Sequence, residues 1–216
     1  PDWSRGLGDV YKRQIHDDLP CMDNDRLRRG KPSTHIKFGE STAILAGNSL
    51  LTLAFEMIAD QKFKLDTHIK LNLIKKLSEC AGHVGIAGGQ FLDLNYEKKN
   101  IDFKKIINMQ RKKTGKLFEF CCLAPAIVAK KNTKTQKEMS KVGEEIGLLF
   151  QIADDLLDVK GNEKSTGKSV KKDKKKGKST LIKLFGYEKT LGFALDRKKT
   201  IINKLKKYGK KSNKLI

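Results

Sequence analysis

Residues 150–160 read FQIADDLLDVK and carry Gln151, Asp154, Asp155 and Asp158 at spacings of three and four residues. These spacings place the four polar side chains on one face of a helix. Apolar residues recur at the same steps here and in the preceding residues, which predicts a helix packed in a core. The apolar positions are Met139, Val142, Ile146, Leu149, Ala153 and Leu157. We therefore expect the carboxylates beside buried surface.

Three neighbouring carboxylates at the edge of a core are unfavourable unless cations neutralise them. A second acidic cluster, Asp17, Asp18 and Asp23, lies near the start of the sequence. Because each cluster is short and is followed by basic residues, we interpret the two as walls of one cavity that binds divalent cations. Magnesium fits best, since it binds one or two carboxylates plus substrate phosphates, whereas zinc prefers Cys and His at spacings that this sequence lacks. A solvated acidic helix face is the alternative for the later cluster.

The composition indicates an all-α fold with one core. The chain has 216 residues, of which 38% are hydrophobic, and this is enough for a single domain. It has only four prolines, long stretches with three- and four-residue periodicity and no run of alternating β-branched residues. The four cysteines show no spacing typical of a metal or redox site, so we expect free, mostly buried thiols and a cytoplasmic location.

The formal net charge of +21 favours phosphorylated ligands or nucleic acid as partners. A basic helical module that binds RNA or DNA is therefore an alternative, although it leaves the acidic clusters unexplained. No apolar run reaches ~18 residues, and the apolar stretch 43–55 is interrupted by polar residues. We expect that stretch to be a buried helix and predict no transmembrane segment.

The first 14 residues, PDWSRGLGDVYKRQ, hold the only Trp and differ in composition from the rest. We interpret residues 1–14 as a leader foreign to the protein and residues 15–216 as the folded domain.

The first acidic cluster lies in residues 15–31, IHDDLPCMDNDRLRRGK. Pro20 should end or kink a helix there, because it lacks an amide donor, and the resulting turn can gather Asp17 and Asp23. Arg28 and Arg29 follow at once.

A guanidinium group matches phosphate oxygens well, so carboxylates, metal and arginine together describe a cradle for a diphosphate. The alternative is that Arg28 and Arg29 pair with Asp23 and Asp25.

The middle of the chain predicts apolar helices at 40–59 and 66–84, followed by Gly85, Gly88 and Gly89. Gln90 and Asp93 come next, where small residues permit close approach of backbone or ligand; plain helix packing is an equal alternative. Asp102 can cap a helix that runs to about residue 112. We expect the Lys113-Thr114-Gly115 step to break it before a second apolar run to residue 129.

Residues 161–180, GNEKSTGKSVKKDKKKGKST, form a strongly basic segment after the acidic helix. A phosphate-binding loop needs four residues between its glycines, but Gly161 and Gly167 enclose five and follow a helix rather than a strand, so we reject that motif. Lys168 and Lys178 are the lysines expected nearest the acids. From Tyr187 onward the pattern is that of an amphipathic helix.

Two motif pairs resemble those of the trans-isoprenyl diphosphate synthases, specifically the bacterial farnesyl and geranylgeranyl diphosphate synthases. They are DDLPCMD with LRRG after it, and FQIADDLLD with GKST after it. The segments HIKFGESTAILAGNSLLTLAF, GGQFLDL and KTG follow the same family in order and spacing.

The resemblance implies an all-α, isoprenoid synthase-like helical bundle around a deep central cavity, usually in a homodimer. It implies magnesium-dependent condensation of an allylic diphosphate with isopentenyl diphosphate. Three magnesium ions would be held by Asp17, Asp18, Asp23, Asp154, Asp155 and Asp158. The allylic diphosphate would be contacted by Arg28, Lys113, Lys168 and Lys178, and isopentenyl diphosphate by Arg29. Thr114 and Gln151 would offer oxygen dipoles to the allylic cation.

A class I terpene cyclase is the alternative enzyme, because it shares the first acidic cluster. Cyclases of that kind usually carry an Asn-Ser-Glu pattern in place of the second cluster. The family also has further residues that bind isopentenyl diphosphate ahead of the first cluster, and a last helix beyond the end of this sequence. We therefore expect that this chain alone does not catalyse the condensation.

Overall fold

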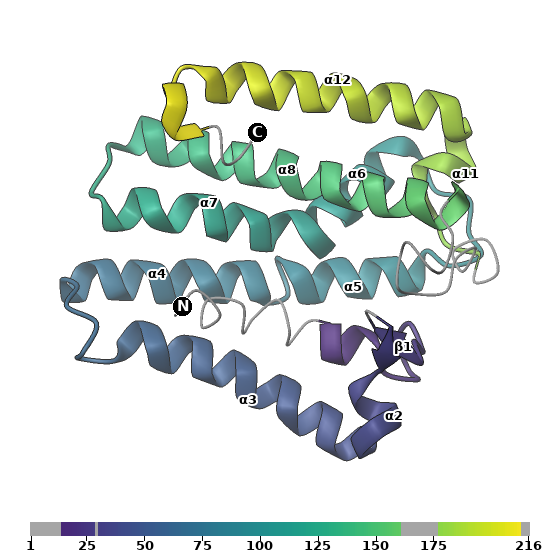
Figure 1. Ribbon diagram of the computed structural model, residues 1–216, viewed down its shortest axis with the longest axis horizontal. Helices are drawn as coiled ribbons and strands as arrows, with labels where there is room; N and C mark the ends of the chain where they lie inside the picture. Colours follow the sequence, from purple (N-terminus) through teal and green to yellow (C-terminus); the bar gives the residue numbers. More distant parts are fainter. Residues whose placement is uncertain (1–13, 29, 161–176, 213–216) are drawn as a thin grey trace. The chain divides into compact units, whose positions relative to one another are not determined.

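The structure is a computed structural model that describes residues 14–28, 30–160 and 177–212. Over these residues the chain is almost entirely helical, which confirms the predicted all-α class (Figure 1). The described residues divide into two compact units. The first unit ends at Lys75 and the second begins at Lys76, and each is described by itself.

The first unit begins with helical residues 14–17 and a short hairpin. Its strands pair Leu27 with Pro32 and Arg28 with Lys31 in antiparallel register. Gly30 lies between them with φ +75°, a left-handed conformation that favours glycine. The elements of this unit are β1 (Leu27–Arg28), β2 (Lys31–Pro32), α2 (Thr34–Phe38) and α3 (Glu40–Ala59), and α4 (Thr67–Ala81) crosses into the second unit.

Helix α3 forms where the sequence predicted it, but the expectation that it is buried is wrong. Only Ala43 and Gly47 are buried, while Leu45 is 65% exposed. An 18-residue window of α3 has a mean hydropathy of 1.5 and is 11% buried, so by length and composition α3 could cross a membrane. The core helix of a soluble protein can pass the same test. The structure thus leaves an apolar helix face uncovered within the described chain.

The second unit is a layered helical packing in which α7 and α8 run antiparallel and α12 lies along α8 (Figure 1). Asp102 caps α6 as predicted, because its Oδ1 accepts a hydrogen bond of 3.0 Å from the backbone N–H of Lys105. The remaining elements are α5 (Ile86–Asn95), α6 (Phe103–Gln110), η2 (Arg111–Gly115), α7 (Lys116–Val128), α8 (Thr133–Lys160), α11 (Leu181–Phe185), α12 (Tyr187–Lys206) and η3 (Gly209–Ser212).

The buried stripe of α8 changes position along the helix. Val142 packs against Ile201 and Leu205 of α12, as its predicted core position requires. Further along, the prediction is wrong, because Ala153 and Leu157 are exposed. The buried residues there are Leu148, Ile152 and Leu156, which pack with Ile106, Leu181 and Ala194. Both stripes are apolar in sequence, and the position of α6, α11 and α12 decides which one is covered.

Aromatic side chains extend this core between α6 and α12. Phe103 packs edge-on against Phe193, with ring centroids 5.8 Å apart. It also contacts Phe185 of α11 at 5.6 Å. Each contact of this kind adds about 0.5–1.5 kcal/mol beyond the burial of apolar area.

Glycines let α7 and α8 approach to backbone contact. A Cβ added at Gly143 would lie 2.4 Å from Phe118 O and 2.6 Å from Glu119 Cα. A Cβ added at Gly147 would lie 2.6 Å from Gly115 Cα. Backbone atoms cannot rotate away, so only glycine, which has no Cβ, fits at these two positions of α8.

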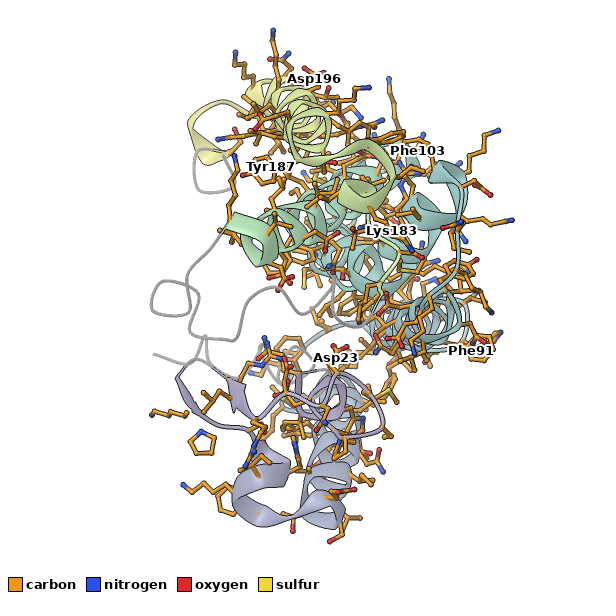
Figure 2. All side chains as sticks on the ribbon, turned by 90° about the vertical axis from the view of Figure 1, so that its right-hand side faces the viewer. Asp23, Phe91, Phe103, Lys183, Tyr187 and Asp196 are labelled. Atoms are coloured by element: carbon orange, nitrogen blue, oxygen red, sulfur yellow. The ribbon has the colours of Figure 1, made fainter. Side chains whose placement is uncertain are left out.

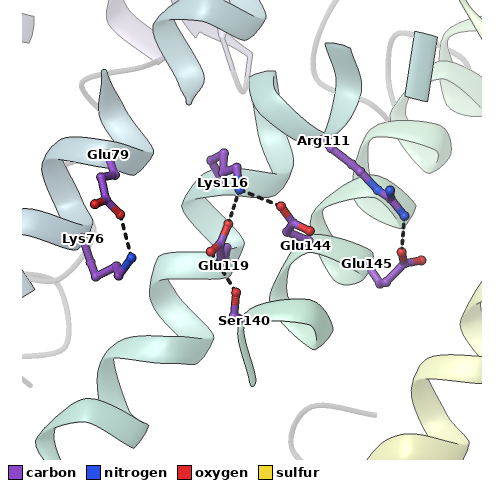
Figure 3. Close-up of polar contacts among 8 residues, drawn as sticks. All are labelled: Lys76, Glu79, Arg111, Lys116, Glu119, Ser140, Glu144 and Glu145. Atoms are coloured by element: carbon purple, nitrogen blue, oxygen red, sulfur yellow. Dashed lines mark hydrogen bonds and ion pairs between the residues drawn. The ribbon is translucent and has the colours of Figure 1, made fainter. Parts of the chain in front are cut away.

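Ion pairs also join α7 to α8 (Figure 3). Lys116 Nζ lies 2.6 Å from Glu119 Oε2 and 2.7 Å from Glu144 Oε1, and the hydroxyl of Ser140 donates to Glu119 Oε1 at 2.8 Å. Burial alone would lower the pKa of Lys116, but the hydrogen bonds and charges of the two glutamates raise it to about 12. Lys116 therefore stabilises two acids that would otherwise repel each other.

Gly143→Ala is expected to lower the free energy of unfolding by about 1–3 kcal/mol, because the added methyl group forces α7 and α8 apart. The measurement is urea unfolding followed by circular dichroism. Gly192→Ala is the matched control, since no atom lies within 4 Å of its Cβ position on α12. That control should gain up to about 1 kcal/mol from helix propensity. Equal stability of wild type and Gly143→Ala would contradict the close packing.

Lys116→Met is expected to cost about 1–3 kcal/mol at neutral pH, because it leaves Glu119 and Glu144 without their shared cation. A group whose pKa is higher in the folded state stabilises that state fully below its unfolded pKa. The stability advantage of the wild type should therefore be full below pH ~10 and decline as the pH rises past about 12.

Lys76→Met is the control for this variant. Its ion pair with Glu79 is 2.7 Å long but lies on α4 with both side chains more than a third exposed, 35% and 41% (Figure 3). Its loss should cost under about 1 kcal/mol. Urea titrations that show equal losses for the two lysine variants would mean that the α7–α8 pair is no stronger than a surface pair.

Candidate functional site

The first acidic cluster lies in a turn that follows helical residues 14–17. The backbone N–H of Asp23 donates to Asp17 O at 2.8 Å, and that of Asp25 donates to Asp18 O at 3.1 Å. The turn around Pro20 therefore brings Asp17 and Asp23 together, as the sequence predicted.

Arg28 binds this cluster from β1. Its Nε donates to Asp18 Oδ2 at 3.2 Å, its Nη2 bonds to Asp18 Oδ1, and the same Nη2 lies 3.5 Å from Asp25 Oδ2. Arg28 thus pairs with Asp18 and Asp25, of which only Asp25 was named in the pairing alternative, and its contact with a diphosphate stays a prediction. Arg29 lies outside the described residues.

Burial and charge act in opposite directions on this pair. Burial raises the pKa of Asp18, and the hydrogen bond and charge of Arg28 oppose this only in part. Burial would lower the pKa of Arg28, but the hydrogen bond to Asp18 and the charges of Asp18, Asp25 and Asp17 raise it. The guanidinium of Arg28 therefore lies in the field of three carboxylates, those of Asp18, Asp25 and Asp17.

The second acidic cluster lies near the end of α8. Asp155 and Asp158 are buried, with 4% and 7% of their surfaces exposed, and Asp154 is half-buried. A solvated acidic face is therefore excluded for this part of α8. Asp155 accepts two amide hydrogen bonds of 2.9 Å, one from Gln110 Nε2 and one from Gln151 Nε2.

The Lys113-Thr114-Gly115 step does not break the helix, contrary to the prediction. It forms η2, a π-helical turn that joins α6 to α7 without interruption. Gly115 has helical φ and ψ and is used for packing against Gly147 rather than for a break. Such wide turns shift the direction of the side chains that follow. The hydroxyl of Thr114 consequently reaches α8 and donates to Gln151 Oε1 at 2.8 Å.

Asp93 of α5 binds two of the predicted substrate lysines. Lys113 Nζ and Lys178 Nζ each lie 2.7 Å from the same oxygen, Asp93 Oδ2. The two ammonium groups are therefore within roughly 5 Å of each other and would repel by about 3 kcal/mol at an effective dielectric constant of ~20. Burial alone would raise the pKa of Asp93, but the charges and hydrogen bonds of the two lysines outweigh it and hold the pKa below its usual value.

The glycines before Asp93 serve helix packing, one of the two alternatives that the sequence left open. A Cβ at Gly89 would lie 2.1 Å from the backbone nitrogen of Lys113, so α5 touches the backbone of η2 directly.

The sequence did not indicate that two buried polar residues, Asp93 and Gln110, bind the predicted site residues. Asp93 was noted only for its place after the glycines, and Gln110 was not singled out. The available signal was a polar side chain on an otherwise apolar helix face, since Gln110 is buried together with Ile106 and Met109. Periodicity marks such a face as buried but does not identify the partner.

The donor set fits magnesium, although the described residues alone form no complete metal site. Within the described residues, no three side chains of Asp, Glu, His or Cys lie together closely enough to hold a metal ion. Magnesium needs only one or two carboxylates and takes its other ligands from water and substrate phosphates. Lys168, a further predicted substrate residue, lies outside the described residues.

Comparison with known proteins identifies close relatives. The family model described as polyprenyl synthetase matches residues 14–215. A farnesyl diphosphate synthase of Geobacillus stearothermophilus is 39% identical over 186 residues, which cover 84% of this chain and 63% of that protein. A geranylgeranyl diphosphate synthase of Cyanophora paradoxa is 40% identical over 178 residues, which cover 82% of this chain and 59% of that protein.

A crystal structure gives the same result. The geranyltransferase from Helicobacter pylori complexed with magnesium and isoprenyl diphosphate is 33% identical, with a TM-score of 0.86. The match covers 94% of this chain and 66% of that one. The chain thus spans about three fifths of the length of these curated relatives. Since the family model matches nearly all of its length, this chain belongs to the polyprenyl synthetase family.

Proposed function

We propose that the protein is a magnesium-dependent prenyltransferase that condenses an allylic diphosphate with isopentenyl diphosphate into a longer trans-prenyl diphosphate. The observation that carries this proposal is a pair of polar groups that start from consecutive residues of η2. Lys113 shares Asp93 with Lys178, and Thr114 bonds to Gln151, which in turn donates to Asp155 of α8. Cations for a diphosphate, oxygen dipoles for a carbocation and acids for a metal are thereby joined in one structure.

The allylic diphosphate binds first in this proposal. Lys113, Lys178, Arg28 and Lys168 contact its oxygens, and Arg29 binds isopentenyl diphosphate. The two acidic clusters would hold magnesium, which would supply positive charge to stabilise the departing diphosphate. The six acids proposed as ligands are Asp17, Asp18, Asp23, Asp154, Asp155 and Asp158. Both oxygens of Asp155 already accept amide hydrogen bonds, and both oxygens of Asp18 already accept from Arg28.

The chemistry then consists of cleavage of a carbon–oxygen bond, formation of a carbon–carbon bond and transfer of a proton. Cleavage of the carbon–oxygen bond leaves an allylic cation, which the side-chain oxygens of Thr114 and Gln151 stabilise. The mutual hydrogen bond of these side chains, 2.8 Å long, fixes their orientation before the cation forms. The double bond of isopentenyl diphosphate attacks the cation, and the new cation loses a proton to the released diphosphate.

Asp154→Ala is expected to weaken magnesium-dependent binding of geranyl diphosphate by at least about tenfold, because it removes a carboxylate proposed to hold the metal. Calorimetry with and without magnesium provides the measurement. Asp196→Ala is the matched control, an exposed acid on α12 that is labelled in Figure 2. Its affinity should equal that of the wild type.

Assays of the same purified protein distinguish the proposed prenyltransferase from the alternative functions. Unchanged binding by Asp154→Ala would contradict a metal-binding role for the second cluster. A cyclic hydrocarbon formed from geranyl diphosphate alone would favour a class I terpene cyclase. Binding of RNA or DNA that ignores magnesium and falls steeply with salt, without diphosphate binding, would favour a nucleic-acid-binding module.

We further propose that the protein acts in the cytoplasm as a homodimer that covers the apolar face of α3. The proposed location rests on the cysteine spacings in the sequence, which show no paired pattern. Cys80 is buried as expected, whereas Cys21 and Cys121 are exposed. Leu45 and Leu53 of α3 are 65% and 44% exposed, and an apolar surface of this kind favours association.

Leu45→Lys/Leu53→Lys is expected to convert a dimer into a monomer, because two charges in an apolar interface remain unpaired. Sedimentation velocity measures the change. Leu195→Lys, at an equally exposed leucine of α12 with 57% exposure, should leave the dimer intact. Flotation of the wild type with lipid vesicles, lost in the α3 variant, would show instead that α3 binds a membrane.

A further inference from the structure

The lysine pair of the second unit is held by a residue that the proposed function does not use. Asp93 is 5% exposed, and its Oδ2 accepts from Lys113 and Lys178 at once. The two lysines come from distant parts of the chain, one from η2 and one from the segment before α11. A buried carboxylate that joins two such cations fixes both ammonium groups at one point.

The backbone of each lysine is also fixed against α5. Gly89 brings α5 into contact with η2, where a Cβ would lie 2.1 Å from Lys113 N. On the other side of Asp93 in the sequence, the N–H of Lys98 donates to Gly177 O at 2.8 Å. The hydroxyl of Ser179 lies 2.8 Å from Tyr96 O and 3.2 Å from Lys99 O. Helix α5 and the residues directly after it therefore orient both lysines.

The charge balance shows why this arrangement suits an anion. The three groups by themselves carry two positive charges and one negative charge. The side chains of Lys113 and Lys178 are each only 10% exposed, and few rotamers remain open to them. A ligand that meets an ordered pair of lysines loses less conformational entropy than one that must order them.

We propose that Asp93 is a positioning residue that aligns Lys113 and Lys178 for the oxygens of a diphosphate. Asp93 acts through the two lysines and does not touch the ligand itself. This inference rests on the proposed function, because that function assigns the lysines to the diphosphate.

The test is a double-mutant cycle read by calorimetry with inorganic pyrophosphate and magnesium. Asp93→Asn keeps the size of the side chain but removes its charge, and it should weaken binding about tenfold, as loss of an orienting group does in metal sites. Lys113→Met/Lys178→Met should weaken binding further. In that background, added Asp93→Asn should change the affinity by less than about twofold, because its only route to the ligand is gone.

The cycle distinguishes positioning from a structural role. If Asp93 only stabilised the fold, Asp93→Asn would weaken binding by the same factor with and without the lysines, and that result would overturn the proposal. Unchanged affinity of Asp93→Asn in the wild-type background would overturn it as well. Asp196→Asn serves as a control for the loss of one negative charge on an exposed helix position.

The wild type separates this inference from the proposed function. Failure of the wild type to bind pyrophosphate in the presence of magnesium would contradict the function, and with it the assignment of Asp93. Binding by the wild type that is insensitive to Asp93→Asn would contradict the positioning role alone. Asp93→Glu should recover part of the affinity, because it restores the charge at a different reach.

Discussion

Backbone contact at glycine is the constraint on which the second unit depends. Gly89 brings α5 onto η2, and Gly147 brings α8 onto Gly115 of the same turn. The π-helical turn is therefore held between two helices at distances that no side chain would allow. Because η2 is fixed in this way, consecutive residues can serve different partners: Lys113 reaches Asp93 on α5, and Thr114 reaches Gln151 on α8.

Two buried acids and one half-buried lysine of this unit each have two partners. Asp93 has two ammonium groups, and Asp155 has two amides. Lys116 has two carboxylates. A single partner for a buried charge often fails to offset the cost of removing it from water, whereas several hydrogen bonds together do so. The same arrangement that stabilises the fold thus leaves charged groups in fixed positions, as an anion-binding site requires.

The sequence predicted the helices well and the contacts of their side chains less well. The cap at Asp102 and the turn around Pro20 follow from local rules, because a capping carboxylate and a missing amide act within a few residues. The prediction of a helix break at Lys113-Thr114-Gly115 was wrong, because a glycine can mark either a break or a close contact between helices. Only the presence of Gly147 opposite Gly115 distinguishes the two. Likewise, α8 offers two apolar stripes, and its neighbours determine that Leu156 rather than Leu157 is covered.

By itself the sequence determined the all-α class, the two acidic clusters and the basic residues near them, because periodicity and residue type are local properties. Its motifs also led to the family that the comparisons establish. The tertiary structure alone decided that Asp93 joins Lys113 to Lys178, that Gln110 and Gln151 share Asp155, and that Arg28 binds Asp18. Apart from the bond between Gln151 and Asp155, which lie four residues apart on α8, these contacts join residues of different elements. The distance between such residues depends on how the elements pack rather than on any pattern within one helix.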